Sequence, residues 1–101
     1  MSIQEGDIWY RHERTEETDD GWKCQPLFIQ VVRTTKSSAF VKRVEGRKCN
    51  GKNACTVRSP VRTGDEEERI RLKDMEADWH RWEGGDVANT IEEREWLEVV
   101  I

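Results

Sequence analysis

The sequence has no long hydrophobic run, and its longest is three residues, as in Leu27–Ile29. A membrane-spanning helix needs about 20 mostly apolar residues. The N-terminal segment MSIQEGD also lacks the basic start and the apolar stretch of a secretion signal. We therefore expect no membrane span and no export, and the sequence predicts a soluble cytoplasmic protein.

Catalytic and metal-binding motifs are missing as well. The chain contains no G-x-S-x-G, GK[ST] or H-E-x-x-H, so we predict neither catalytic residues nor a cofactor. Its three cysteines, Cys24, Cys49 and Cys55, fit a reducing compartment better than a secreted disulfide framework. Cys49 and Cys55 are spaced too widely for the usual zinc-binding C-x(2–4)-C turn, so we predict no metal site. Whether these two thiols pair is open.

The chain is short and has a low content of apolar residues. Its 101 residues are enough for one domain, residues 1–101, with one core. Charged residues make up 38% and hydrophobic residues only 35%, but five tryptophans supply large areas for burial. We therefore predict a folded domain.

The segment from Leu27 to Val44 predicts a β-hairpin. Two runs rich in β-branched and aromatic residues, Leu27–Val32 and Ala39–Val44, flank the polar group Thr34 to Ser38, which we interpret as the turn. Both faces of the hairpin carry apolar residues. A strand with two apolar faces is typical of a small barrel or a strongly curved sheet, so we predict a mainly β, SH3-like or partly open antiparallel barrel with at most one short helix.

Charge is distributed unevenly along the chain. Residues 1–32 carry three basic residues against seven acids, residues 33–62 carry nine against one, and residues 63–101 carry five against thirteen. The middle third predicts a nucleic-acid-binding surface, because clustered Lys and Arg side chains neutralise phosphates. Its candidate residues are Lys42, Arg43, Arg47, Lys48, Lys52, Arg58 and Arg62. These charges could instead neutralise the acidic thirds, within the fold or across a dimer.

Two acidic segments are interpreted as solvated. Residues 11–21, RHERTEETDDG, contain five acids and no aliphatic residue, so we expect a loop after an opening strand at Gly6–Tyr10. Its acids Glu16, Glu17, Asp19 and Asp20 form a candidate protein-binding site for a basic partner. Asp65–Glu68 is predicted to be an acidic turn.

The last third combines a predicted strand with an aromatic segment. Residues 69–75 alternate apolar and basic residues, which predicts a half-buried strand. Trp79 and Trp82 are interpreted as core residues in preference to a ligand platform. Thr90–Glu93 resembles a helix cap, whereas Val99–Ile101 favours a final strand, so the start of the C-terminal segment is ambiguous.

Several short motifs carry a resemblance. They are Gly6-Asp7-Ile8-Trp9-Tyr10, Phe28-Ile29-Gln30-Val31-Val32, the turn residues Thr35 and Ser37, the pair Val41 and Arg43, and Trp82-Glu83-Gly84. Together they resemble a group of small uncharacterised proteins encoded by phages and other mobile elements. The resemblance covers about half of the chain. It implies a compact SH3-like β-barrel and a phage or accessory-gene setting, and it transfers no catalytic residue.

Two functional hypotheses follow. In the first, the protein is a non-enzymatic phage or mobile-element protein that binds another protein through its acidic segments, for example as an inhibitor of a host defence system such as CRISPR–Cas. In the second, it is a small barrel that binds nucleic acid through the basic segment 33–62. We expect no membrane partner, and a homodimer through an exposed strand edge is an open alternative.

Overall fold

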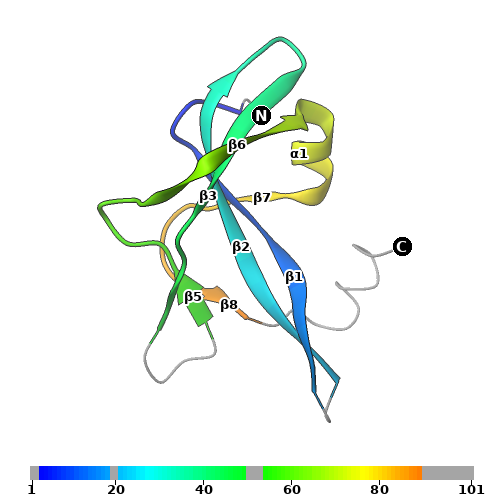
Figure 1. The fold of residues 1–101 in the computed structure, drawn as a ribbon, viewed down its shortest axis with the longest axis vertical. Coiled ribbons are helices and arrows are strands. Elements are labelled where there is room, and N and C mark those ends of the chain that lie inside the picture. The colour runs from blue at the N-terminus through cyan, green and yellow to red at the C-terminus, as the bar shows by residue number, and fades with distance from the viewer. Residues whose placement is uncertain (1–2, 19–20, 50–53, 90–101) are drawn as a thin grey trace.

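The hairpin predicted from Leu27 to Val44 forms two adjacent inner strands of the large sheet (Figure 1). The computed structural model describes residues 3–18, 21–49 and 54–89. Five strands form an antiparallel sheet in the order β6-β3-β2-β1-β7, and three short strands form a second sheet in the order β4-β5-β8. The elements are β1 (Ile8–Thr18), β2 (Gly21–Thr34), β3 (Ser38–Val44), β4 (Arg47–Lys48), β5 (Ala54–Thr56), β6 (Thr63–Arg71), α1 (Leu72–Asp78), β7 (His80–Arg81) and β8 (Val87–Ala88).

The turn between β2 and β3 is held by its own polar groups. The Thr35 backbone N–H donates to the Ser38 carbonyl oxygen at 2.8 Å, and the Ser38 N–H donates to Thr35 Oγ1 at 3.2 Å. A Thr side chain that accepts a backbone N–H in this way competes with continued strand pairing and favours a turn. The predicted hairpin, with a polar turn between two apolar arms, is thus confirmed.

One face of the large sheet packs against helix α1. Trp9 pairs with Ile29 and Val31 pairs with Val41, and all four side chains are almost fully buried on this face. The helix adds Met75, which is fully buried, and Trp79 follows directly after it. These residues form the first hydrophobic core.

The opposite face of the same sheet is covered by the small sheet. Phe28 of β2 and Val44 of β3 are paired neighbours on this face, and they pack with Cys55 and Val57 in a second core. Trp82 and Val87 lie at its margin. Both faces of the hairpin are therefore covered, as predicted, but by two different elements, and the resulting mainly β fold is a partly open barrel.

The acidic segment after Tyr10 is a strand, so the predicted loop is wrong. β1 continues to Thr18 and pairs with β2 from Ile8↔Gln30 to Thr18↔Gly21, with one irregularity between Arg14 and Glu16. Backbone pairing does not depend on apolar side chains, and here it continues on both sides of that irregularity. The two strands form a long arm that extends beyond the rest of the sheet (Figure 1).

The segment around Leu72 also differs from its prediction. The acidic residues 65–68 lie within strand β6 and not in a turn, and β6 ends at Arg71. The chain then forms α1 from Leu72 to Asp78, where Leu72, Met75 and Trp79 follow the helical spacing of three and four residues. No helix among the described residues is long and apolar enough to cross a membrane. The predictions for residues 90–101 fall outside the described residues.

Candidate functional site

Three of the predicted basic residues line one cavity of about 400 Å³. Arg47 comes from β4, Arg58 lies just after β5, and Arg62 lies just before β6. Glu45, Gly46, Ser59 and Pro60 complete the lining, and the Ser59–Pro60 peptide bond is cis. The basic middle third is thus partly gathered at one place, which we call the arginine cavity.

Backbone pairing brings these three arginines together. β4 pairs with β5 through Arg47↔Thr56 and Lys48↔Cys55, so the two ends of the 47–58 segment lie side by side. The Glu45 N–H donates to the Arg62 carbonyl oxygen at 3.0 Å, which holds the end of the loop beside its start. The chain passes close to Phe28 at Gly46, where a Cβ would lie 3.2 Å from Phe28 Cδ2.

The arginines of this cavity are free of carboxylate partners within the described part of the chain. Other arginines are paired there: Arg11 contacts Glu13 at 2.9 Å, Arg33 contacts Glu67 at 2.8 Å, and Arg81 contacts Asp7 at 3.5 Å. Arg47, Arg58 and Arg62 make no such contact with a described residue and are exposed. Their guanidinium groups, each with five donors, are available to an anion from solvent.

The remaining predicted basic residues do not join the arginine cavity. Lys42 and Arg43 are consecutive in β3 and so point to opposite faces of the sheet. Arg43 lines a different cavity, of about 600 Å³, together with the acidic residues Asp65, Glu66, Glu67 and Glu68. Lys48 is exposed on β4, and Lys52 lies outside the described residues. Among the described residues, the middle third forms an ion pair with an acidic third through Arg33 and Glu67, whereas Arg43 only shares a cavity with acidic residues.

The predicted acidic site lies on the long arm. Glu16 is paired in register with Lys23, and Glu17 with Trp22, near the end of the β1–β2 ladder. Asp19 and Asp20 lie outside the described residues. Glu16 and Glu17 therefore belong to a paired strand and not to the predicted loop.

Cys49 and Cys55, of which only Cys55 belongs to the second core, are not disulfide-bonded to each other. Cys55 Sγ donates to Asn89 Oδ1 at 3.1 Å, and Cys49 Sγ donates to Asp86 Oδ1 at 3.1 Å. Burial raises the pKa of the Cys55 thiol, and the nearby Lys48 ammonium lowers it by a smaller amount. Among the described residues no group of three or more His, Cys, Asp or Glu side chains is placed to hold a metal ion.

The aromatic segment after α1 contributes to the cores, as predicted. Trp79 is buried in the first core, with the Arg11 guanidinium 4.6 Å from its ring centroid. Trp82 packs at the margin of the second core, and its Nε1 donates to the Gly85 carbonyl oxygen at 3.1 Å. His80 is exposed, with its ring centroid 5.6 Å from that of Tyr10.

A second basic cluster was missed in the sequence. Lys36, Arg69, Arg71 and Lys73 line a cavity of about 360 Å³ between the β2–β3 turn and the junction of β6 with α1. Three of these residues lie in the acidic last third, where the net negative charge obscures them. The sequence shows the alternation of Arg69, Arg71 and Lys73. It does not show that Lys36 joins them, because Lys36 is 33 residues away from the nearest of them.

Comparison of the chain with protein-family models, with curated proteins and with solved structures found no match. Function is therefore inferred from the residues of this chain.

Proposed function

We propose that the protein is a non-enzymatic binding protein that contacts the phosphate backbone of a nucleic acid through the arginine cavity. The observation that carries this proposal is the convergence of Arg47, Arg58 and Arg62 with no described carboxylate bound to any of them. Arginine binds phosphate oxygens with two parallel N–H donors, so three arginines that pair with no described carboxylate at one cavity favour a phosphate ligand.

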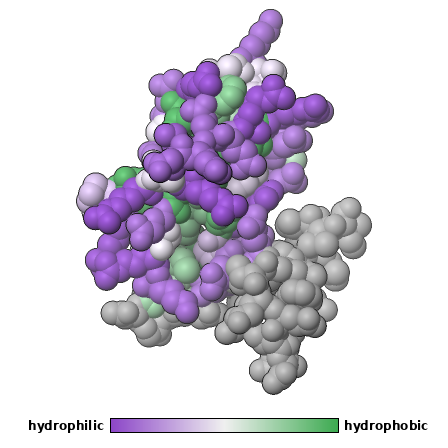
Figure 2. Space-filling view, in the orientation of Figure 1, coloured by the Kyte–Doolittle hydropathy of each residue, from purple (hydrophilic) through white to green (hydrophobic). Residues whose placement is uncertain are grey.

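The surroundings of the cavity favour contact with the backbone over contact with bases. None of the seven described residues that line it is aromatic, so none of them offers a ring on which a base could stack. Most of the coloured surface in Figure 2 is hydrophilic, and Val61 is the one large hydrophobic residue that the described part of the chain exposes. Binding driven by charge, and independent of sequence, is expected from such a surface.

The experiment is a fluorescence-anisotropy titration of random duplex and single-stranded DNA at several salt concentrations. If three phosphates are neutralised, log K falls with log salt at a slope of roughly −2.7 for duplex DNA, so affinity drops roughly 40-fold between about 50 and 200 mM salt. The variant R47Q/R58Q/R62Q should lose most of this binding and flatten the slope.

The matched control is R11Q/R33Q/R81Q, which removes the same charge from arginines that are ion-paired. It should retain most of the affinity. Equal losses in the two triple variants would show that net charge alone matters, and the absence of binding by the unmodified protein at low salt would refute the proposal.

A second candidate function is supported by the long arm. Beyond Arg11, strand β1 pairs only with β2 among the described residues, so the acidic end of the hairpin extends away from the sheet (Figure 1). An acidic arm of this shape can enter a basic groove on a partner protein. We propose as the alternative that a phage or mobile element uses the protein to inhibit a host defence nuclease, such as a CRISPR–Cas effector, by occupying its nucleic-acid-binding surface.

This alternative is tested by target-DNA cleavage with a purified CRISPR–Cas effector. The protein should slow cleavage, and E16Q/E17Q/D19N/D20N should abolish the effect. The variant D65N/E66Q/E67Q/E68Q removes as many negative charges from strand β6 and should still inhibit. Unimpeded cleavage in the presence of excess protein would count against inhibition of that effector class, and equal loss in both variants would count against the arm.

A further inference from the structure

The basic cluster that lines the cavity between the β2–β3 turn and the start of α1 goes beyond the function proposed above. Its cations are Lys36 on the turn, Arg69 and Arg71 on β6, and Lys73 in the first turn of α1. None of the described residues that line this cavity is acidic. Four positive charges without a lining counter-charge repel one another, and a bound anion relieves that repulsion.

These four cations also form no ion pair with any residue that the structure describes. The ion pairs among described residues use Arg11, Arg33 and Arg81, and none of them includes a residue of this cluster. Arg69 and Arg71 are two positions apart on the same strand, so both side chains leave the same face of β6. The register places them opposite Phe40 and Ser38, respectively.

The walls of the cavity are held in place by hydrogen bonds. The Leu72 N–H donates to the Ser37 carbonyl oxygen at 3.0 Å, which joins the β2–β3 turn to the first residue of α1. Within the turn, Thr35 and Ser38 are connected by three short contacts between backbone and side-chain atoms, from 2.8 to 3.3 Å. A site whose walls are already ordered loses little conformational entropy when a ligand binds.

Size and polarity indicate a small anion. The volume of about 360 Å³ lies near the lower end of the range for small-molecule sites, roughly 300–1,000 Å³. Ser37 and Ser38 also line the cavity, and hydroxyl groups can donate to anionic oxygens. Cations with hydroxyl donors are the combination that proteins use to bind phosphate groups.

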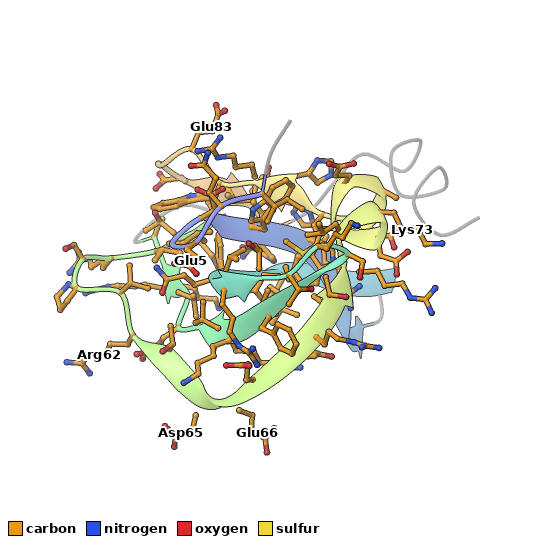
Figure 3. All side chains as sticks on the ribbon, turned by 90° about the horizontal axis from the view of Figure 1, so that it is seen from above. Glu5, Arg62, Asp65, Glu66, Lys73 and Glu83 are labelled. Carbon is orange, nitrogen blue, oxygen red and sulfur yellow. The ribbon has the colours of Figure 1, made fainter. Side chains whose placement is uncertain are left out.

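The cluster is separated from the arginine cavity by acidic residues. Strand β6 starts next to Arg62 and ends at Arg71, and residues 65–68 between them are all acidic and exposed. Figure 3 shows β6 as a bowed ribbon, with Asp65 and Glu66 on its outer side and with Arg62 and Lys73 toward opposite ends. A polyanion that lay along β6 would meet these carboxylates, so the two basic clusters act as separate sites.

We infer that this cavity binds the phosphate group of a small soluble molecule, independently of nucleic-acid binding at the arginine cavity. The four cations hold the phosphate oxygens, and the hydroxyl groups of Ser37 and Ser38 provide further donors.

The test is an NMR titration of the isotopically labelled full chain with inorganic phosphate and, separately, with adenosine monophosphate, both at constant ionic strength. Saturable shifts should appear at the amides of Ser37, Ser38 and Leu72. R69Q/R71Q should weaken this binding by at least tenfold, because each arginine supplies charge-assisted hydrogen bonds. K36Q, on the exposed turn, gives a second variant that leaves β6 unchanged.

The control R47Q/R58Q should bind phosphate at this cavity as tightly as the unmodified protein, whether or not it binds DNA. Shifts that do not saturate, or that persist in both R69Q/R71Q and K36Q, would overturn the inference. So would a result in which duplex DNA, but neither small phosphate compound, shifts these amides. Loss of DNA binding alone would refute only the function proposed for the arginine cavity.

Discussion

Replacing Met75 by alanine should be among the most destabilising single changes in this protein. Met75 is fully buried in the first core, and it is the only residue of α1 that is buried. The helix has seven residues and no side-chain cap at its N-terminus, so it is too short to be stable alone and depends on this contact. Truncation of a buried Met to Ala costs about 2–5 kcal/mol.

A loss of that size is large for a domain of 101 residues, whose total stability lies at about 5–15 kcal/mol. Urea unfolding followed by tryptophan fluorescence measures the loss, because Trp9 and Trp79 belong to the same core. We expect the midpoint to fall with the slope m unchanged. The control M75L keeps the volume and should cost less than about 1.5 kcal/mol. A loss under about 1 kcal/mol for M75A would refute the role of α1 as the cover of this face.

Two further changes test the second core. G46A places a Cβ 3.2 Å from the ring of Phe28, which is almost fully buried and has little room to move, so the unfolding free energy should fall by about 1–3 kcal/mol in the same urea assay. An unchanged midpoint would contradict the close approach. For Cys55, burial raises the pKa above its ordinary value of 9.0, so the unfolded state ionises first as the pH rises. Stability should therefore be fully present below about pH 9 and decline above it, less steeply in C55A than in the unmodified protein. Equal slopes in thermal melts from pH 8 to 10.5 would show that this thiol does not contribute.

The hairpin could be predicted because its local and tertiary requirements agree. Apolar runs of strand type, a polar turn and two apolar faces all favour the same structure, and each is present in the pair β2 and β3. Which elements cover each of the two faces could not be predicted. The sequence does not reveal that Met75 covers one face and that Val57 covers the other, because these contacts join residues far apart in the chain.

The errors have a common physical cause. The segment 11–18 lacks aliphatic residues and so resembles a loop, yet its backbone groups pair with β2. The alternation of residues 69–75 resembles a strand, although Leu72, Met75 and Trp79 also match a helix. In both cases side-chain patterning suggested one structure and tertiary pairing or packing selected another.

The candidate site was partly predictable for a similar reason. Arg47, Arg58 and Arg62 lie within one short segment, so a loop that closes on itself brings them together. Lys36 and Arg69 meet only because β3 pairs with β6, and a charge balance taken along the sequence cannot show that.

The small sheet that covers the second core is held by very few backbone pairs. β4 and β5 share two paired positions, as do β5 and β8, whereas β1 and β2 share ten. Its amides should consequently exchange with solvent deuterium through local openings that leave the central strands protected. Arg47 lies in this sheet and Arg58 just beyond it, so a ligand held by both must also keep the sheet closed. Ligand binding would then be recorded as slower deuterium uptake at Cys55, inside the protein, as well as at the surface that the ligand touches.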